Sequence, residues 1–142
     1  MSTEIAPMRR STYDKAPATV MGPEHPAWTG RAAWDEIARV ALERSVAPVV
    51  AVDVYPGADL PALLEQARSA LAGWDVVDVE DAAARPLAEI DRALRPFLTN
   101  DRVFGVLAHL GLEVFYDDEV LERVGSAARA SGTPTLLVGW GA

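Results

Sequence analysis

The sequence predicts an α/β fold, a three-layer α/β/α sandwich with a mostly parallel sheet, and three observations support this prediction. The first is a set of short apolar runs at 49–54, 74–79 and 135–138, which have the composition of buried strands. The second is that segments with apolar residues at helical spacing separate these runs, as in parallel sheets with right-handed crossovers. The third is the length of 142 residues, which suits one domain with a sizeable core.

Composition limits the class of protein. The chain is 50% hydrophobic and 24% charged, which is typical of soluble globular proteins. Its formal net charge of -8 argues against nucleic acid and anionic membranes as partners. The absence of cysteine excludes disulfides, thiolate metal sites and a cysteine nucleophile. The start has no secretory apolar segment and the chain has no run of about eighteen apolar residues, so we expect a cytoplasmic protein.

The first 17 residues differ from the rest of the chain, and we expect them to form an arm outside the core. They are polar, interrupted by proline, and carry a small positive balance, because three basic residues outnumber two acidic ones. Residues 18–142 are predicted to form a single α/β domain. Its first elements are predicted to be a short edge strand at 18–21 and a loop at 22–26.

A first helix is predicted at 31–44, with Thr29 as its N-cap. Asp35 and Arg39 stand four residues apart on its polar face and are expected to form an ion pair. Four apolar residues share the opposite face: Trp34, Ile37, Ala38 and Ala41.

The stretch 47–60 is expected to organise the fold. Its run Val49–Val52 is predicted to be a strand buried on both faces, which ends at Tyr55-Pro56-Gly57. Asp59 then stands at the N-cap of a helix predicted at 60–72, with Gly73 at its C′ position. A strand, a tight turn and a helix form the unit that places ligands at the carboxyl end of a parallel sheet.

The next helix is predicted to begin at Pro86, which suits a first helical turn, and to end at Pro96. Its apolar stripe contains four residues: Leu87, Ile90, Ala93 and Leu94. The following segment, 103–116, is apolar but interrupted by two glycines. Its pattern leaves a strand, a short helix and a packed loop equally open.

The last predicted elements are a helix at 119–130, which opens with acids and stops before Gly132, and a buried strand at 135–138. The strand is followed only by Gly139-Trp140-Gly141-Ala142, which leaves no room for a further helix. Either this strand lies at an edge of the sheet, or the chain is a piece of a longer protein.

The turn at 55–59 is the first candidate for chemistry. A phosphate-binding loop needs several backbone N–H groups that converge on an anion, usually with a lysine. Here Pro56 has no N–H, Asp59 adds a negative charge, and no lysine follows. We therefore favour a structural turn over a ligand contact, although Tyr55 and Asp59 stand where sheet geometry places ligands.

Acidic residues follow both of the first two strands. Asp53 ends the first strand and is expected to be a structural carboxylate, with a general base or metal ligand as the alternative. Asp78, Glu80 and Asp81 follow the second strand. They suit either a hard cation such as Mg²⁺ or a solvated loop that caps the next helix, and we favour the cap.

Other motifs give weaker signals. His25 and His109 lack the spacing of a zinc site; His25 is expected to be exposed and His109 to lie in the core. No serine has a GxSxG context, which gives no support for nucleophilic serine catalysis. Gly139-Trp140-Gly141 is half of a dinucleotide-binding fingerprint, but no helix or acidic residue follows it.

Several short blocks occur in a characteristic order along the chain. They are Tyr13-Asp14-Lys15, Tyr55-Pro56-Gly57-Ala58-Asp59, Pro86-Leu87-Ala88-Glu89-Ile90-Asp91, Leu98-Thr99-Asn100-Asp101, Val103-Phe104-Gly105 and Gly139-Trp140-Gly141-Ala142. This order resembles the amino-terminal region of long bacterial mannose-6-phosphate isomerase-like proteins, over nearly the whole chain from residue 11 onward. One departure is Arg102, which stands where the family pattern usually has a proline.

The resemblance implies a domain similar to P-loop nucleoside kinases, here without a Walker A loop, that precedes a cupin-type isomerase portion. The full-length family is expected to convert mannose 6-phosphate to fructose 6-phosphate, with zinc held by histidines and a glutamate of the cupin portion. This chain lacks that portion, so we expect no cofactor in this segment and no activity of the isolated chain. Its expected partners are the missing catalytic portion, or a second copy through self-association.

The resemblance also implies a small phosphorylated ligand at the carboxyl edge of the sheet, where Arg85 and Arg102 are the basic residues best placed to meet a phosphate. Two alternatives are an atypical nucleotide-dependent phosphotransferase and a non-catalytic interaction module. No catalytic or metal-binding residue is predicted. The candidate ligand-binding residues are Tyr55, Gly57, Asp59, Asp78, Asp81, Arg85, Arg102, Gly139 and Gly141.

Overall fold

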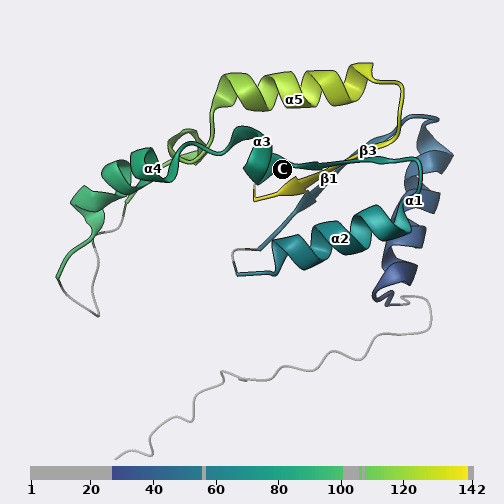
Figure 1. Cartoon of the computed structure of the whole chain (residues 1–142), viewed down its shortest axis with the longest axis horizontal. Helices are drawn as coiled ribbons and strands as arrows, with labels where there is room; N and C mark the ends of the chain where they lie inside the picture. The colour runs from purple at the N-terminus through teal and green to yellow at the C-terminus, as the bar shows by residue number, and fades with distance from the viewer. Residues whose placement is uncertain (1–26, 56, 101–105, 107, 141–142) are drawn as a thin grey trace, which may run out of the picture.

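The structure is a computed structural model that describes residues 27–55, 57–100, 106 and 108–140, and it has an α/β fold with a small parallel sheet (Figure 1). The elements are α1 (Arg31–Arg44), β1 (Val49–Asp53), α2 (Leu60–Ala70), β2 (Asp75–Asp78), α3 (Val79–Ala83), α4 (Leu87–Leu94), the 3₁₀ helices η1 (Arg95–Phe97) and η2 (Leu112–Val114), α5 (Asp118–Ala130) and β3 (Thr135–Gly139). The arm at 1–17, the edge strand at 18–21 and His25 lie outside the described residues.

The sheet has the order β1-β3-β2, and both pairings are parallel. The predicted strand at 135–138 is confirmed, but its suggested place at an edge is wrong, because β3 lies between the other two strands. The prediction that 49–52 is buried on both faces is also wrong. β1 is an edge strand of the described sheet, and its Ala51 is exposed.

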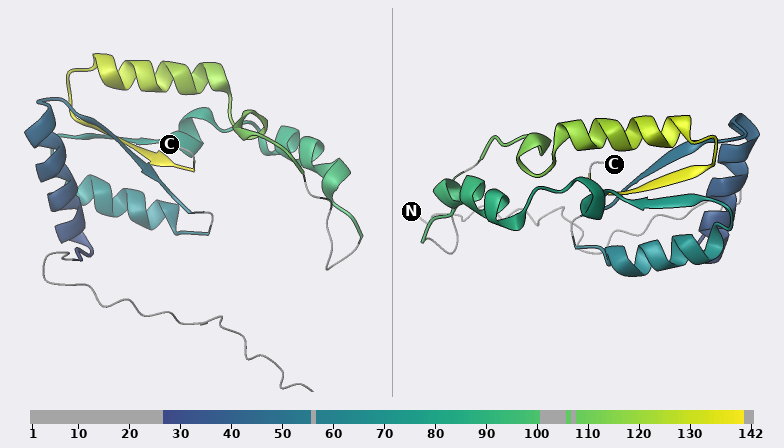
Figure 2. Two further views of the ribbon diagram at one scale, coloured as in Figure 1. Left: turned by 180° about the vertical axis from the view of Figure 1, so that it is seen from behind. Right: turned by 45° about the horizontal axis from the view of Figure 1, so that its top comes forward.

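Helices lie on both sides of this sheet. The connection from β1 to β2 contains α2, and the connection from β2 back to β3 contains α5. Figures 1 and 2 show α2 and α5 on opposite sides of the strands. On one side, Leu136 and Val138 pack with Trp34 of α1 and with residues of α2. On the other side, Leu137 packs against the small cluster around Tyr116.

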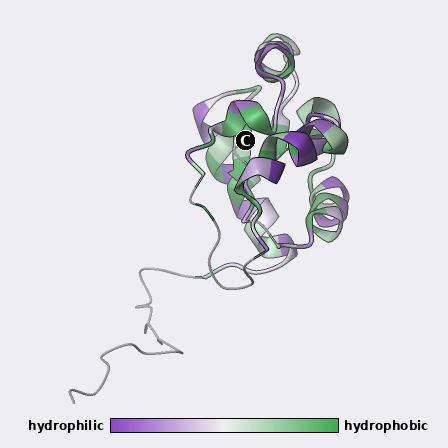
Figure 3. Ribbon diagram, turned by 90° about the vertical axis from the view of Figure 1, so that its left-hand side faces the viewer, coloured by the Kyte–Doolittle hydropathy of each residue, from purple (hydrophilic) through white to green (hydrophobic). Residues whose placement is uncertain are grey.

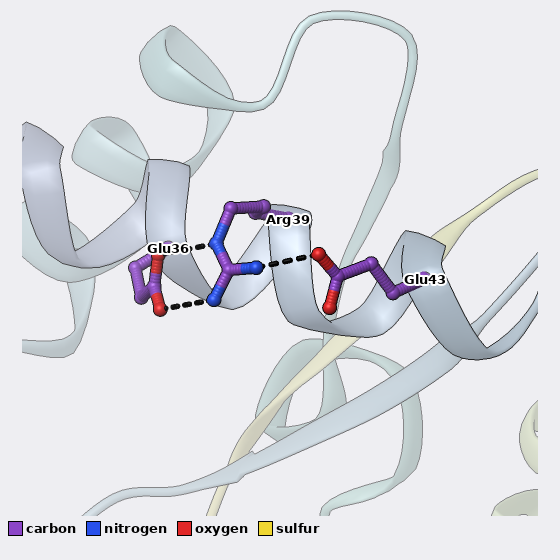
Figure 4. Close-up of polar contacts among 3 residues, drawn as sticks. All are labelled: Glu36, Arg39 and Glu43. Carbon is purple, nitrogen blue, oxygen red and sulfur yellow. Dashed lines mark hydrogen bonds and ion pairs between the residues drawn. The ribbon is translucent and has the colours of Figure 1, made fainter.

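The helix α1 has the predicted bounds but different polar contacts. Gly30, with a φ of 56°, occupies the N-cap in place of Thr29, and no side chain caps the helix. Arg39 does not pair with Asp35. Its Nε and Nη2 donate to both carboxylate oxygens of Glu36 at 2.7 and 2.6 Å, and its Nη1 donates to Glu43 at 2.5 Å (Figure 4). Asp35 is paired with Arg31 instead, with 3.7 Å between its Oδ2 and the Nε of Arg31. All of these pairs are exposed and stabilise the helix little.

The helices α2, α4 and α5 begin close to their predicted starts, because their caps are local, whereas α3 was not predicted and replaces the end of the strand predicted at 74–79. Asp59 and Asp117 each accept a hydrogen bond from the backbone N–H three residues later, and Pro86 precedes α4. α2 ends two residues earlier than predicted, since Leu71 turns into the core and is 4% exposed. Within 103–116, the described part contains η2 and a single bridge between Ala84 and Tyr116.

Hydropathy alternates along the helical ribbons, as expected for helices with one face on a core (Figure 3).

His109 is exposed, so its predicted place in the core is wrong. Among the described residues, no helix has both the length and the apolar character needed to cross a bilayer.

Candidate functional site

The loop after β1 contains three predicted site residues, Tyr55, Gly57 and Asp59. The Tyr55 side chain is 84% exposed. Gly57 has a φ of +100°, a backbone conformation that strongly favours glycine, so it forms the turn. The Oδ1 of Asp59 accepts a hydrogen bond from the N–H of Ala62 at 3.0 Å and caps α2. The three residues therefore share one loop at the carboxyl end of β1.

The first four residues of α2, all of them described, leave no backbone N–H for an anion. The N–H of Leu60 donates to a carbonyl two residues earlier at 2.9 Å, and Pro61 has no N–H. The N–H groups of Ala62 and Leu63 donate to the side chain and the carbonyl of Asp59, both at 3.0 Å. Because a helix N-terminus binds phosphate through free N–H groups, this one lacks the donors that such a site requires.

Asp78 and Asp81 lie at the carboxyl end of β2. The Oδ1 of Asp78 accepts hydrogen bonds from the N–H groups of Glu80 at 3.0 Å and of Asp81 at 3.2 Å, so Asp78 caps the short helix α3. Asp81 is exposed. In the described part of the chain, no group of three or more histidine, aspartate or glutamate side chains is arranged to hold a metal ion.

The side chain of Glu80, which belongs to α3, lies at the carboxyl end of the central strand β3. Its Oε1 accepts a hydrogen bond from the N–H of Trp140 at 2.8 Å and a short one from the hydroxyl of Tyr116. Tyr116 is only 3% exposed. This position, above the carboxyl end of a central parallel strand and between the loops of its neighbours, is where open α/β sheets place ligands. A carboxylate of the chain itself therefore lies at this end of the sheet.

Gly139 makes this close approach of α3 to β3 possible. A Cβ at Gly139 would lie 2.8 Å from Cβ of Val79 and 3.3 Å from Oε1 of Glu80. Gly139 also aligns with Asp53 in the register of β1 and β3, and its carbonyl accepts a hydrogen bond from Val54 at 3.0 Å. The glycine is needed here for packing between α3 and β3, and no ligand has to be invoked to explain it.

The acidic residues at this edge act together on Tyr116. Burial, above all, raises the pKa of the Tyr116 phenol, and the hydrogen bond to Glu80 and its negative charge raise that pKa further. Asp53 and Asp78 act in the same direction through their charges. The side chains of Asp53, Asp78, Glu80 and Tyr116 thus form one electrostatic group that keeps the phenol neutral well above its ordinary range.

This group predicts a pH dependence of stability. In the unfolded chain, Tyr116 ionises near pH 10, whereas in the folded chain it keeps its proton to a higher pH. Above about pH 10 the unfolded state binds fewer protons, so the stability from this residue is complete below that pH and is lost as pH rises. We expect the urea unfolding midpoint to fall more between about pH 8 and about pH 11 in the wild-type chain than in Tyr116→Phe.

The matched control for this prediction is Tyr55→Phe, because Tyr55 is 84% exposed. That variant should keep the wild-type pH dependence. If the urea midpoint fell equally with pH in the wild-type chain and in Tyr116→Phe, the fold would not be holding the phenol of Tyr116 neutral.

Arg85 has a structural role in the described chain. Its Nε donates to the carbonyl oxygens of Glu113 at 2.9 Å and Tyr116 at 3.0 Å, and its backbone N–H donates to Phe115 at 2.8 Å. These bonds tie the link between α3 and α4 to the segment that carries Tyr116. A phosphate contact through Nε of Arg85 would therefore compete with the two hydrogen bonds that this nitrogen donates. Arg102 and Gly141 lie outside the described residues.

The carboxyl edge of the sheet brings together the loop with Tyr55, the cap Asp78 and the packing residue Gly139. Two residues at its centre, Glu80 and Tyr116, were absent from the predicted set. Glu80 was noted in the sequence only as part of an acidic cluster. The signal for Tyr116 is its hydroxyl in an apolar segment, because a buried tyrosine usually needs a hydrogen-bond partner.

The fold and the site together define a small parallel α/β domain in which Glu80 and Tyr116 lie at the carboxyl edge of the sheet. The chain belongs to the family described as "Domain of unknown function (DUF8485)", which matches residues 33–142. No curated protein and no solved structure matches the chain. The family match includes all three strands of the sheet and most of α1.

Proposed function

We propose that this chain is the amino-terminal, kinase-like module of a mannose-6-phosphate isomerase-like protein, and that the module itself carries no catalysis. In this proposal the helices and the sheet form a three-layer α/β/α sandwich without a Walker A loop, in a cytoplasmic protein. Conversion of mannose 6-phosphate to fructose 6-phosphate, and the zinc it needs, belong to a separate cupin portion. The ordered sequence blocks support the family part of the proposal.

The position of the Glu80 carboxylate at the carboxyl edge of the sheet supports the proposal that the module is not catalytic. The carboxylate of Glu80 accepts hydrogen bonds from Trp140 and Tyr116 at the end of β3, where a substrate or nucleotide would lie. A second anion at this position would meet the negative charge of Glu80 as well as those of Asp53 and Asp78. The phosphate-binding alternative at α2 is disfavoured too, since Asp59 caps that helix.

The proposal predicts the outcome of ligand and activity measurements on the purified chain. ATP with Mg²⁺, GTP with Mg²⁺, and mannose 6-phosphate should each leave the thermal unfolding midpoint unchanged. A ligand present at about 100 times its Kd would stabilise the fold by about 2.7 kcal/mol, which corresponds to a shift of several degrees. We also expect no isomerisation of mannose 6-phosphate and no hydrolysis of ATP above the rates in buffer.

Asp59→Asn is the matched variant for the nucleotide measurement, because asparagine can still cap α2 but carries no charge. A shift with ATP and Mg²⁺ that grows in Asp59→Asn would overturn the proposal in favour of a phosphotransferase with an atypical loop. Turnover of mannose 6-phosphate would place catalysis in this module. A shift with mannose 6-phosphate alone, without turnover, would replace the proposal by a ligand-binding module.

A further inference from the structure

The outer edge of β1 has backbone groups that point away from β3. The N–H of Val54 donates to Gly139 at 3.0 Å, and the N–H of Thr135 donates to Pro48 at 2.8 Å. Because backbone groups alternate between the two sides of a strand, the even-numbered residues of β1 face β3. The N–H and C=O of Ala51 therefore point away from β3, and in the described sheet no strand pairs with that side.

An apolar groove runs beside this edge. It has a volume of about 890 Å³ and is lined by α1, by the start of β1 and by Arg129 of α5. Its apolar lining includes Ile37, Val40, Val49 and Val50. The groove therefore lies at the start of β1, mainly between this strand and α1. An open strand edge next to apolar surface is a template for another strand.

The two edge strands of the described sheet differ in how well their side chains prevent pairing with another strand. β2 begins and ends with a charged residue, Asp75 and Asp78. β1 has four apolar residues in a row, Val49–Val52, before its first charge at Asp53, and it contains neither proline nor lysine. Charged residues and proline are the usual devices that prevent edge-to-edge pairing, so β1 is the edge that accepts a partner.

We propose that the partner is a second copy of this chain, which pairs antiparallel with β1 about a two-fold axis at Ala51 and joins the two sheets. The sequence of β1 is complementary to itself in this register. Ala51 faces its own copy in a hydrogen-bonded pair, Val50 faces Val52 of the second copy, and Val49 faces Asp53. No like charges oppose each other, and pairs of β-branched side chains stabilise antiparallel strands.

The groove is lined by charged residues of both signs, Glu36 together with Arg44 and Arg129. Both carboxylate oxygens of Glu36 already accept hydrogen bonds from Arg39, so the register of β1, and not these charges, specifies the two-fold pairing. The pairing must overcome the repulsion between two chains of net charge -8. We therefore expect a concentration-dependent dimer that is strengthened by salt, because salt screens this repulsion.

Analytical ultracentrifugation of the full chain tests the proposal, with mass as the readout. With rising protein concentration, the mass should increase from 15.2 kDa towards twice that value, and at a fixed concentration it should increase with sodium chloride. Ala51→Lys should abolish the dimer, since it places two ammonium groups opposite each other at the axis. Ala88→Lys, the same substitution at an exposed position of α4, should dimerise like the wild-type chain.

Ala51→Pro is a second variant, which removes the outward N–H of residue 51 while the N–H and C=O groups that bond to β3 belong to its neighbours. Far-UV circular dichroism and the urea midpoint show whether each variant is folded. A wild-type chain that stays monomeric at every concentration and salt would overturn the proposal. Dimers of unchanged strength in both Ala51 variants would also overturn it, because another surface would then hold the copies together. Neither result depends on whether the module is catalytic.

Discussion

Leu136→Ala is expected to destabilise the protein by about 2–5 kcal/mol, the largest effect of any single substitution predicted here. Leu136 lies in the central strand β3, is 0% exposed, and belongs to the cluster that joins α1 and α2 to the sheet. β3 is held by hydrogen bonds on both sides, so the backbone cannot move to fill the cavity that alanine leaves. The free energy of unfolding from urea denaturation measures the loss.

Leu42→Ala is the matched control, because Leu42 is 46% exposed on α1. We expect it to change the free energy of unfolding by no more than about 0.5 kcal/mol. If Leu136→Ala and Leu42→Ala lowered the free energy of unfolding by similar amounts, β3 would not be the centre of the core. Since a typical domain is stable by only about 5–15 kcal/mol, Leu136→Ala should also leave a measurable unfolded fraction at low urea.

The four longer helices of this fold could be predicted from the sequence because their signals are local, whereas the short helix α3 could not. Asp59 caps α2 through a hydrogen bond to a residue three positions later, and Asp117 does the same for α5. The position of each strand in the sheet could not be predicted in this way. The runs Val49–Val52 and Thr135–Val138 have the same apolar, partly β-branched character, and only the crossovers decide which becomes central.

The site shows the same division between local and distant contacts. The capping role of Asp59, and the poor phosphate geometry that follows from it, could be argued from neighbouring residues. The hydrogen bond between Tyr116 and Glu80 joins positions 36 residues apart, and no periodicity predicts it. Arg85 was assigned to a phosphate because it is basic and lies in a loop. In the structure its Nε instead donates to the carbonyl oxygens of Glu113 and Tyr116, acceptors that no residue pattern identifies.

Gly139→Ala is expected to destabilise the protein by about 1–3 kcal/mol through overpacking. The added Cβ would lie 2.8 Å from Cβ of Val79. Val79 is only 2% exposed, and because a Cβ atom is fixed to the backbone, no side-chain rotation relieves this contact. Gly139 has no positive φ, so the cost comes from the contact and not from backbone strain. To accept the methyl group, α3 must move away from β3 and carry Glu80 with it. Urea denaturation measures the loss of stability.

Gly125→Ala is the control for this substitution, because its Cβ would meet only the end of a flexible side chain, 3.3 Å from Nη1 of Arg129. Gly125 lies within α5, where alanine is favoured over glycine by up to about 1 kcal/mol, so this variant should be as stable as the wild-type chain or more so. The two variants also separate packing from the site itself. If Gly139→Ala displaces Glu80, Tyr116 loses its hydrogen-bond acceptor. The pKa of Tyr116, followed by ultraviolet absorbance, should then move towards the ordinary value for tyrosine. A Gly139→Ala variant with unchanged stability and an unchanged titration would mean that α3 does not hold Glu80 at the end of β3.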